Sequence, residues 1–166
     1  MTRKNRAMLI GSIGAGKSTL TNALLGKEAR AVKTQALIYY DWIVDTPGEY
    51  TENPLFYKNI MATSLEVSHV LFLQDATKQK NIFPPGFSQG INKLPIGVVT
   101  KSDASGADVS RAIKQLKTVV TRGPLIISSS IRGEGIQEIR DIVKCNSLNE
   151  MKTYIEQHPS DYMIFP

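Results

Sequence analysis

Residues 11–18 read Gly-Ser-Ile-Gly-Ala-Gly-Lys-Ser. They follow a short apolar run at residues 7–10 and precede a stretch whose apolar residues have helical spacing. The pattern G-x-x-x-x-G-K-[ST] between a strand and a helix is typical of a phosphate-binding P-loop. Its glycines let the backbone approach the phosphates closely, and the helix N-terminus adds positive potential. The stretch therefore predicts an α/β protein that binds a nucleoside triphosphate.

Two side chains of this loop have predicted roles of their own. Lys17 should reach the β- and γ-phosphates and is a catalytic candidate, while the Ser18 hydroxyl should ligate Mg²⁺. The residues predicted to contact nucleotide here are Gly11, Ser12, Ile13, Gly14, Ala15, Gly16, Lys17, Ser18 and Thr19. GTPases, ATPases and small-molecule kinases all use such a loop, so it specifies neither the base nor the reaction.

Apolar runs alternate with helical patterns along the chain, which favours a mostly parallel sheet with helices on both faces. Strands are expected at residues 7–10, 37–40, 42–45, 70–73, 96–99 and 125–127. Helices are expected after the P-loop, from about Pro54 with Leu55 and Leu65 on the inner face, and at 109–120 and 136–143. Residues 76–94 contain prolines and glycines and predict an irregular loop.

The chain has 166 residues, 42% of them hydrophobic and 21% charged, which is typical of a globular domain. We expect this domain to span residues 1–145, followed by a tail at 146–166 with a short helix and an apolar end. The single cysteine excludes an internal disulfide and fits a reducing cytoplasm. No apolar stretch approaches the roughly 20 residues of a membrane span.

The formal net charge of +5 raises the question of nucleic-acid binding. The basic residues are scattered, however, and aromatic residues do not interleave with them. A basic surface of this kind suits a polyphosphate ligand, so a nucleic-acid partner is disfavoured.

Residues 44–50, Val-Asp-Thr-Pro-Gly-Glu-Tyr, predict a metal and switch segment. Asp45 ends an apolar strand, where its carboxylate should hold Mg²⁺ through water, and the Gly48 amide should donate to the γ-phosphate. Thr34 lies in the aperiodic segment before it and should complete the Mg²⁺ shell when triphosphate is bound. Glu49 stands where Ras-like switches carry the glutamine that orients the attacking water.

Two segments that follow predicted strands favour guanine as the base. The Asp103 carboxylate can accept hydrogen bonds from guanine N1–H and the 2-amino group, which adenine lacks. Thr100 and Lys101 precede it, and the Lys101 stem can cover one face of the base. Ser129 and Ser130 follow the last predicted strand, where the Ser130 amide can donate to the guanine 6-oxygen.

These segments, in this order, resemble the five guanine-nucleotide motifs of translation-factor-class small GTPases. The segments are residues 11–18, Thr34, and residues 45–48, 100–103 and 129–130. More narrowly, three segments resemble the ethanolamine- and propanediol-utilisation P-loop proteins of the EutP/PduV family. These are Lys-Thr-Gln-Ala at 33–36, Asp-Thr-Pro-Gly-Glu-Tyr at 45–50 and Phe-Pro-Pro-Gly-Phe at 83–87.

The resemblance implies a Ras-like P-loop NTPase with a six-stranded sheet whose second strand is antiparallel. It also implies a cytoplasmic bacterial setting, a link to metabolic microcompartments with shell or lumen proteins as partners, and an association with acetate kinase activity. Three residues depart from the general GTPase pattern. Thr100 replaces an asparagine, and Glu49 replaces the glutamine. Ile13 replaces a glycine and would crowd any glutamine or partner arginine inserted at the γ-phosphate.

Three hypotheses follow from these features. The first is a slow GTPase or switch that binds GTP, GDP and Mg²⁺, in which Glu49 slows hydrolysis or serves another acceptor. The second is a small-carboxylate kinase that uses ATP and acetate. For the charge clamps of such a kinase the 76–94 loop offers lysines but no arginine, and Arg30 is another candidate. The third is a nucleotide-loaded docking module without catalysis, which uses the tail or the basic surface.

Overall fold

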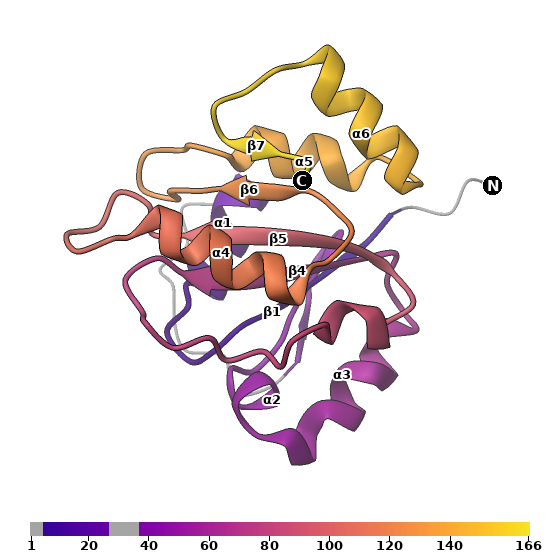
Figure 1. The fold of residues 1–166 in the computed structure, drawn as a ribbon. Coiled ribbons are helices and arrows are strands. Elements are labelled where there is room, and N and C mark those ends of the chain that lie inside the picture. Colours follow the sequence, from indigo (N-terminus) through magenta and orange to yellow (C-terminus); the bar gives the residue numbers. More distant parts are fainter. Residues whose placement is uncertain (1–4, 27–36) are drawn as a thin grey trace.

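The chain folds around one mixed β-sheet with helices on both faces (Figure 1). The structure is a computed structural model, and it describes residues 5–26 and 37–166. Within these residues the strand order is β2-β3-β1-β4-β5-β6-β7. The strands are β1 (Ala7–Ile10), β2 (Ile38–Tyr39), β3 (Ile43–Asp45), β4 (His69–Asp75), β5 (Leu94–Thr100), β6 (Leu125–Ile127) and β7 (Met163–Ile164).

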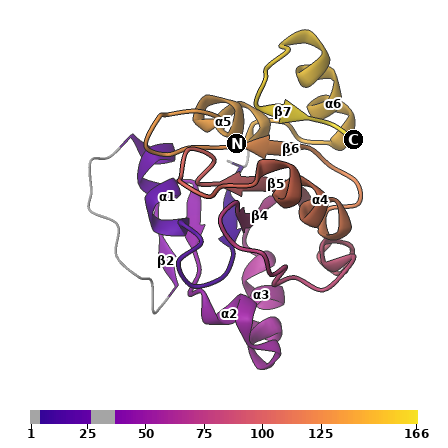
Figure 2. The same ribbon diagram turned by 60° about the vertical axis from the view of Figure 1, so that its left-hand side comes forward.

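Alternating side chains of the buried strands divide the core between the two faces of the sheet. Leu9 and Leu71 pack on one face with α1, α5 and α6, whereas Met8 and Phe72 pack on the other with α3 and α4 (Figure 2). The helices are α1 (Lys17–Leu25), α2 (Glu49–Glu52), α3 (Tyr57–Ser64), α4 (Val109–Val119), α5 (Ile136–Val143) and α6 (Leu148–Gln157), with the 3₁₀ helices η1 (Pro54–Phe56) and η2 (Phe87–Gly90). No helix in the described ranges is long and apolar enough to cross a membrane.

The parallel centre of the sheet brings the predicted site segments to one edge. Strands β3, β1, β4, β5 and β6 run parallel, and β2 pairs antiparallel with β3. The P-loop follows β1, and Asp45, Asp75 and Thr100 end β3, β4 and β5. Ligands of open α/β sheets bind at the carboxyl ends of the strands, so this edge is the candidate site.

The expectation of six strands is wrong, because the tail adds a seventh. Strand β7 pairs antiparallel with β6, with Met163 opposite Ile126. The predicted short tail helix is present as α6, and its Met151 is fully buried in the same hydrophobic cluster as Met163. The tail therefore packs against the rest of the chain, because burying these two side chains removes apolar surface from water.

The segment after β3 also differs from expectation. Helix α2 begins at Glu49, earlier than the expected start near Pro54, and the extended Asn53 separates it from η1. Leu55 and Leu65, expected to face the core, are 77% and 73% exposed. Leu55 lies in η1, whose tighter winding does not continue the period of α3, and Leu65 follows the last residue of α3.

A buried histidine links the first residue of β4 to the end of α5. His69 is fully buried, with Nδ1 2.7 Å from Ser68 Oγ and Nε2 2.9 Å from the Cys145 carbonyl oxygen. Burial lowers the pKa of His69, and the hydrogen bond to Cys145 opposes this only in part. The folded protein therefore favours the neutral imidazole.

We expect this histidine to make folding stability fall in mild acid. The unfolded chain takes up the proton near pH 6.5 and the folded chain only at lower pH. The free energy of unfolding should therefore be retained above pH 6.5 and decrease below it, by up to about 1.4 kcal/mol per pH unit. Urea unfolding at pH 7.5, 6.5 and 5.5 measures this. His69→Gln should flatten the dependence, whereas the exposed control His158→Gln should not; equal slopes for the wild type and His69→Gln would contradict the assignment.

Candidate functional site

The P-loop is wound by glycines with left-handed backbone. Gly14 and Gly16 have φ values of +80° and +96°, which residues with a Cβ rarely adopt. A turn within the loop is closed by the Ala15 amide, which donates to the Ser12 carbonyl at 3.0 Å. Gly16 then caps α1, whose first residue is Lys17. The sequence pattern thus places the lysine where the loop turns into the helix.

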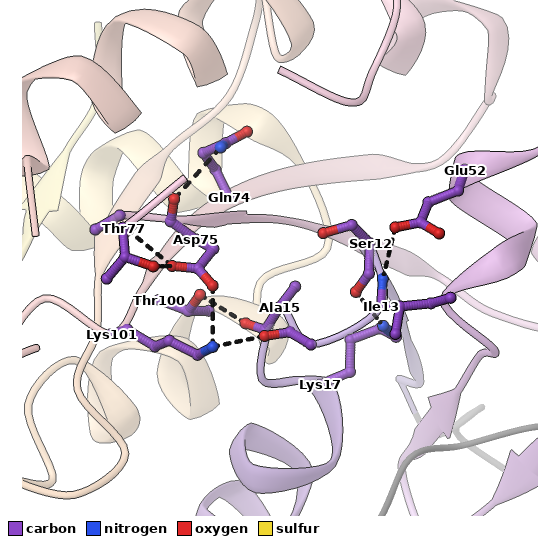
Figure 3. Close-up of polar contacts among 12 residues, drawn as sticks. Ser12, Ile13, Ala15, Lys17, Glu52, Gln74, Asp75, Thr77, Thr100 and Lys101 are labelled. Atoms are coloured by element: carbon purple, nitrogen blue, oxygen red, sulfur yellow. Dashed lines mark hydrogen bonds and ion pairs between the residues drawn. The ribbon is translucent and has the colours of Figure 1, made fainter. Parts of the chain in front are cut away.

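Lys17 is buried, and its amine is held by the loop itself. Its Nζ donates to the carbonyl oxygens of Gly11 at 3.0 Å and Ser12 at 2.9 Å (Figure 3). Burial lowers the pKa of Lys17, while the carboxylates of Asp45 and Glu52 act in the opposite direction. A buried ammonium group that donates to neutral carbonyl oxygens gains from an anionic ligand, which would offset its desolvation.

The predicted metal residues lie side by side. Ser18 Oγ donates to Asp45 Oδ2 at 3.0 Å, and Asp45 is fully buried at the end of β3. The next residue, Thr46, donates its hydroxyl to the Leu9 carbonyl at 2.7 Å, which fixes β3 to β1 at this point. Hydroxyl and carboxylate oxygens are the donors that Mg²⁺ prefers, so this pair fits the ion.

A metal held only by side chains is not indicated. Across residues 5–26 and 37–166, no group of three or more His, Cys, Asp or Glu side chains is arranged to bind a metal ion. A Mg²⁺ ion here would need further oxygens from a nucleotide. The other predicted metal ligand, Thr34, lies outside the described residues.

The segment after Asp45 contacts the P-loop through a glycine. Gly48 has an ordinary helical φ of −60°, but a Cβ on it would lie 2.6 Å from Ile13 backbone and side-chain atoms. Position 48 therefore requires glycine because Ile13 lies so close to it, and not because of its backbone conformation. Ile13 itself remains 44% exposed at the mouth of the loop.

Of the two glutamates of α2, Glu52 is the one that contacts the P-loop. Glu52 Oε1 accepts a hydrogen bond from the Ile13 amide at 3.2 Å (Figure 3). Glu49, the predicted catalytic candidate, is exposed on the first turn of α2. Sequence reasoning missed Glu52; the only available signal was its spacing of three residues from Glu49, which places both on a similar side of a helix.

The end of β5 braces the other side of the P-loop. The Thr100 hydroxyl donates to the Ala15 carbonyl at 2.7 Å, and Lys101 Nζ donates to the Gly14 carbonyl at 2.6 Å. Lys101 has a φ of +60°, unusual for a residue with a side chain. Thr100 thus forms a link to the P-loop despite standing where the GTPase pattern has asparagine.

Asp75 at the end of β4 is a second residue that sequence reasoning missed. Its side chain is 1% exposed and forms an ion pair with Lys101, with 2.9 Å between Oδ2 and Nζ. Asp75 Oδ1 accepts from the Thr77 amide and hydroxyl at 2.8 and 2.6 Å. Burial raises the pKa of Asp75, but these hydrogen bonds and Lys101 outweigh burial and hold the pKa below its ordinary value. The sequence signal that could have identified Asp75 is its position as a carboxylate at the end of a buried apolar strand.

Asp103 and Ser129, predicted from separate segments, are in contact. Ser129 Oγ donates to Asp103 Oδ1 at 2.7 Å, and Ser129 is fully buried. The Ser129 backbone also pairs with Glu134 in both directions at 3.0 Å. Ser130 follows it and is partly exposed. One oxygen of the Asp103 carboxylate is therefore fixed in direction by a rigid neighbour.

We expect the Thr100 hydroxyl to support both stability and ligand binding. Thr100→Val keeps the shape but leaves the buried Ala15 carbonyl without this donor, which should cost roughly 1–3 kcal/mol of unfolding free energy. Thr100→Ser keeps the hydroxyl and is the matched control. Urea unfolding gives the free energy, and GDP titration should show weaker binding to Thr100→Val only. Equal stability of both variants would rule out this role.

Comparisons with known proteins find relatives over most of the chain. A family model described as "Ethanolamine utilisation - propanediol utilisation" (PduV-EutP) matches residues 4–145. "Probable acetate kinase EutP" of Escherichia coli is 34% identical over 138 residues, which are 82% of this chain and 87% of that protein. "Propanediol utilization protein PduV" of Citrobacter freundii is 30% identical over 134 residues, which are 81% of this chain and 89% of that protein.

Among solved structures, the small GTPase Arl6 BBS3 from Trypanosoma brucei, with the bound nucleotide analogue GppNp, has a TM-score of 0.60 to this chain. The match covers 87% of this chain and 100% of that one, at 17% sequence identity. A likeness at this identity shows the fold alone. It confirms the predicted α/β fold of the small-GTPase kind.

Proposed function

The chain belongs to the PduV-EutP family of ethanolamine- and propanediol-utilisation proteins, and on that premise we propose that it binds guanine nucleotides and hydrolyses GTP slowly, as a switch. The observation that carries this proposal is the contact between Asp103 and Ser129, beside a P-loop that Thr100 and Lys101 brace. These contacts support a site in which the Asp103 carboxylate reads the base and the P-loop binds the phosphates.

Guanine is the base that suits this carboxylate. Guanine donates N1–H and 2-amino hydrogens, both of which Asp103 can accept, and adenine would leave the carboxylate without these donors. The hydrogen bond from Ser129 holds Asp103 in place before the base arrives, which reduces the entropy lost on binding. In this proposal the Lys101 stem covers one face of the base, and the Ser130 amide donates to the 6-oxygen.

The phosphates and Mg²⁺ occupy the opposite end of the proposed site. Lys17 exchanges its loop carbonyl partners for phosphate oxygens, and the backbone from Gly11 to Thr19 surrounds the phosphates. Ser18 and Asp45 hold Mg²⁺ together with phosphate oxygens, and Thr34 joins the shell when triphosphate is bound. When bound, Mg²⁺ would neutralise part of the negative charge of the phosphates. The contact between Ser18 and Asp45 at 3.0 Å supports this assignment.

Slow hydrolysis is favoured over phosphotransfer to a small carboxylate. Glutamate at position 49 can accept a hydrogen bond from water but cannot donate as glutamine does. The segment between β4 and β5, which offers lysines for a kinase lid, is packed into the core through Phe83 and Ile91. The Gly86 amide also donates to the Thr118 carbonyl of α4. A lid would have to break these contacts to close over a substrate.

Titration and turnover measurements test the proposal directly. Isothermal titration with GDP, GTP and ATP in the presence of Mg²⁺ should show binding of both guanine nucleotides and much weaker binding of ATP. Phosphate release from GTP should be slow and independent of acetate. Tighter binding of ATP than of GTP would refute the guanine assignment, and acetate-dependent formation of acetyl phosphate would establish the kinase alternative.

Microcompartment shell or lumen proteins are the partners that we propose for the nucleotide-loaded form, in a cytoplasmic setting. The tail was a candidate docking element, but Met151 and Met163 belong to the core, so deleting residues 146–166 would damage the fold. Pull-down of shell proteins by the intact chain loaded with GDP or with a GTP analogue is the better test. Association that depends on the nucleotide would support a switch, and association without turnover would support a docking module.

A further inference from the structure

The carboxylate of Glu52 occupies a P-loop position that an anionic ligand would also seek. Its Oε1 accepts from the Ile13 amide at 3.2 Å, and its charge acts on Lys17 in the direction that favours the ammonium form. P-loop amides and the adjoining helix N-terminus attract anions in general. In this structure the Glu52 carboxylate already accepts a hydrogen bond from one of these P-loop amides (Figure 3).

The contact lies on the side of the loop that the third phosphate approaches in the proposed function. Gly48, whose amide is proposed to donate to the γ-phosphate, packs against Ile13. Glu52 ends α2, the short helix that begins directly after its N-cap Gly48, so a single turn of helix connects the two residues. The residues proposed to read the base have other partners: Lys101 donates to the Gly14 carbonyl, and Asp103 accepts from Ser129.

We propose that Glu52 is a specificity-determining residue that competes with the γ-phosphate and so favours diphosphate over triphosphate. The inference rests on the proposed nucleotide binding. A diphosphate leaves the hydrogen bond between Glu52 and Ile13 in place. A triphosphate brings further negative charge beside the carboxylate, which must give up this bond and turn towards solvent. Glu52 is exposed, so this movement is open to it and solvent screens the repulsion.

Replacing Glu52 with glutamine separates charge from hydrogen bonding. Glutamine keeps an acceptor for the Ile13 amide but removes the negative charge. For this variant, the ratio of the GDP to the GTPγS dissociation constant should rise about tenfold, or about 1.4 kcal/mol of selectivity. The GDP dissociation constant itself should change by less than about threefold, because GDP does not displace the side chain at position 52.

The experiment is titration of the intact chain with GDP and GTPγS in the presence of Mg²⁺. Glu156→Gln, an exposed substitution on α6 with the same change in net charge, is the matched control and should leave the ratio unchanged. Glu52→Ala removes both the charge and the acceptor, and it should shift the ratio in the same direction as Glu52→Gln. A shift in Glu52→Ala without one in Glu52→Gln would refute charge as the cause and assign the effect to the hydrogen bond.

Three other results of these titrations would each refute a specific claim. A wild type that binds both nucleotides, with the same ratio in Glu52→Gln, refutes the inference about Glu52 and leaves the proposed function intact. An equal rise in Glu156→Gln shows that general surface charge, and not the contact with Ile13, sets the ratio. A wild type that binds neither nucleotide overturns the proposed function and this inference with it.

Discussion

Asp103→Asn is expected to lower the affinity for GDP about 100-fold and to raise the affinity for xanthosine diphosphate. The asparagine amide faces the guanine 2-amino group, so two donors meet and one hydrogen bond to a charged acceptor is lost. Xanthine carries an oxygen at that position, which the new amide can satisfy. The Ser129 hydroxyl can still donate to the asparagine oxygen, so the local fold should be retained.

Titration with both diphosphates measures this exchange of base preference. Asp161→Asn, an exposed substitution with the same charge change, should leave both affinities unaltered. The melting temperature of Asp103→Asn should stay close to that of the wild type. Weaker binding of guanine and xanthine alike would mean that Asp103 supports the site without reading the base. Unchanged GDP affinity would remove it from the site.

Lys17→Met is expected to reduce affinity for GDP and GTP by more than about 100-fold while leaving the free protein at least as stable as the wild type. The lysine is proposed to supply the positive charge beside the β- and γ-phosphates, and close charged contacts of this kind contribute several kcal/mol. In the free protein the same amine is buried, and burial lowers its pKa, so the fold disfavours the ammonium form. Removing it relieves that cost and loses two hydrogen bonds to carbonyl oxygens.

Two measurements distinguish a ligand-binding role from a structural one. Urea unfolding of Lys17→Met should give a free energy equal to or above that of the wild type, and nucleotide titration should show little binding. Lys152→Met, on the exposed side of α6, is the matched control and should bind normally. Loss of binding together with a large loss of stability would show that Lys17 mainly holds the loop together.

Much of the fold could be predicted from the sequence, because the features that decide it are local. The P-loop pattern between strand and helix, the strand at residues 125–127 and the helix at 136–143 all need only near neighbours to be recognised. The Asp108 side chain caps α4 by accepting from the Arg111 amide at 3.0 Å, a contact between residues three apart in sequence. Parallel strands then bring the segments after them to one edge of the sheet by geometry alone.

Candidate residues could be selected by type, since phosphate, Mg²⁺ and guanine each require particular donors and acceptors, but this selection missed Glu52 and Asp75. Their partners were not predictable. Ser129 holding Asp103, Asp75 pairing with Lys101 and Thr100 bracing the P-loop each join segments far apart in sequence. Such contacts depend on how strands align, which local patterns do not encode.

The sequence by itself determined that this chain forms a P-loop α/β domain, because backbone periodicity and glycine placement act over a few residues. Only the tertiary structure decided that the tail adds β7 to the sheet and that Glu52, and not Glu49, contacts the Ile13 amide. Both outcomes depend on long-range packing. A two-residue strand forms only where a partner edge is available, and Gly48 lets the segment that begins α2 approach Ile13 closely.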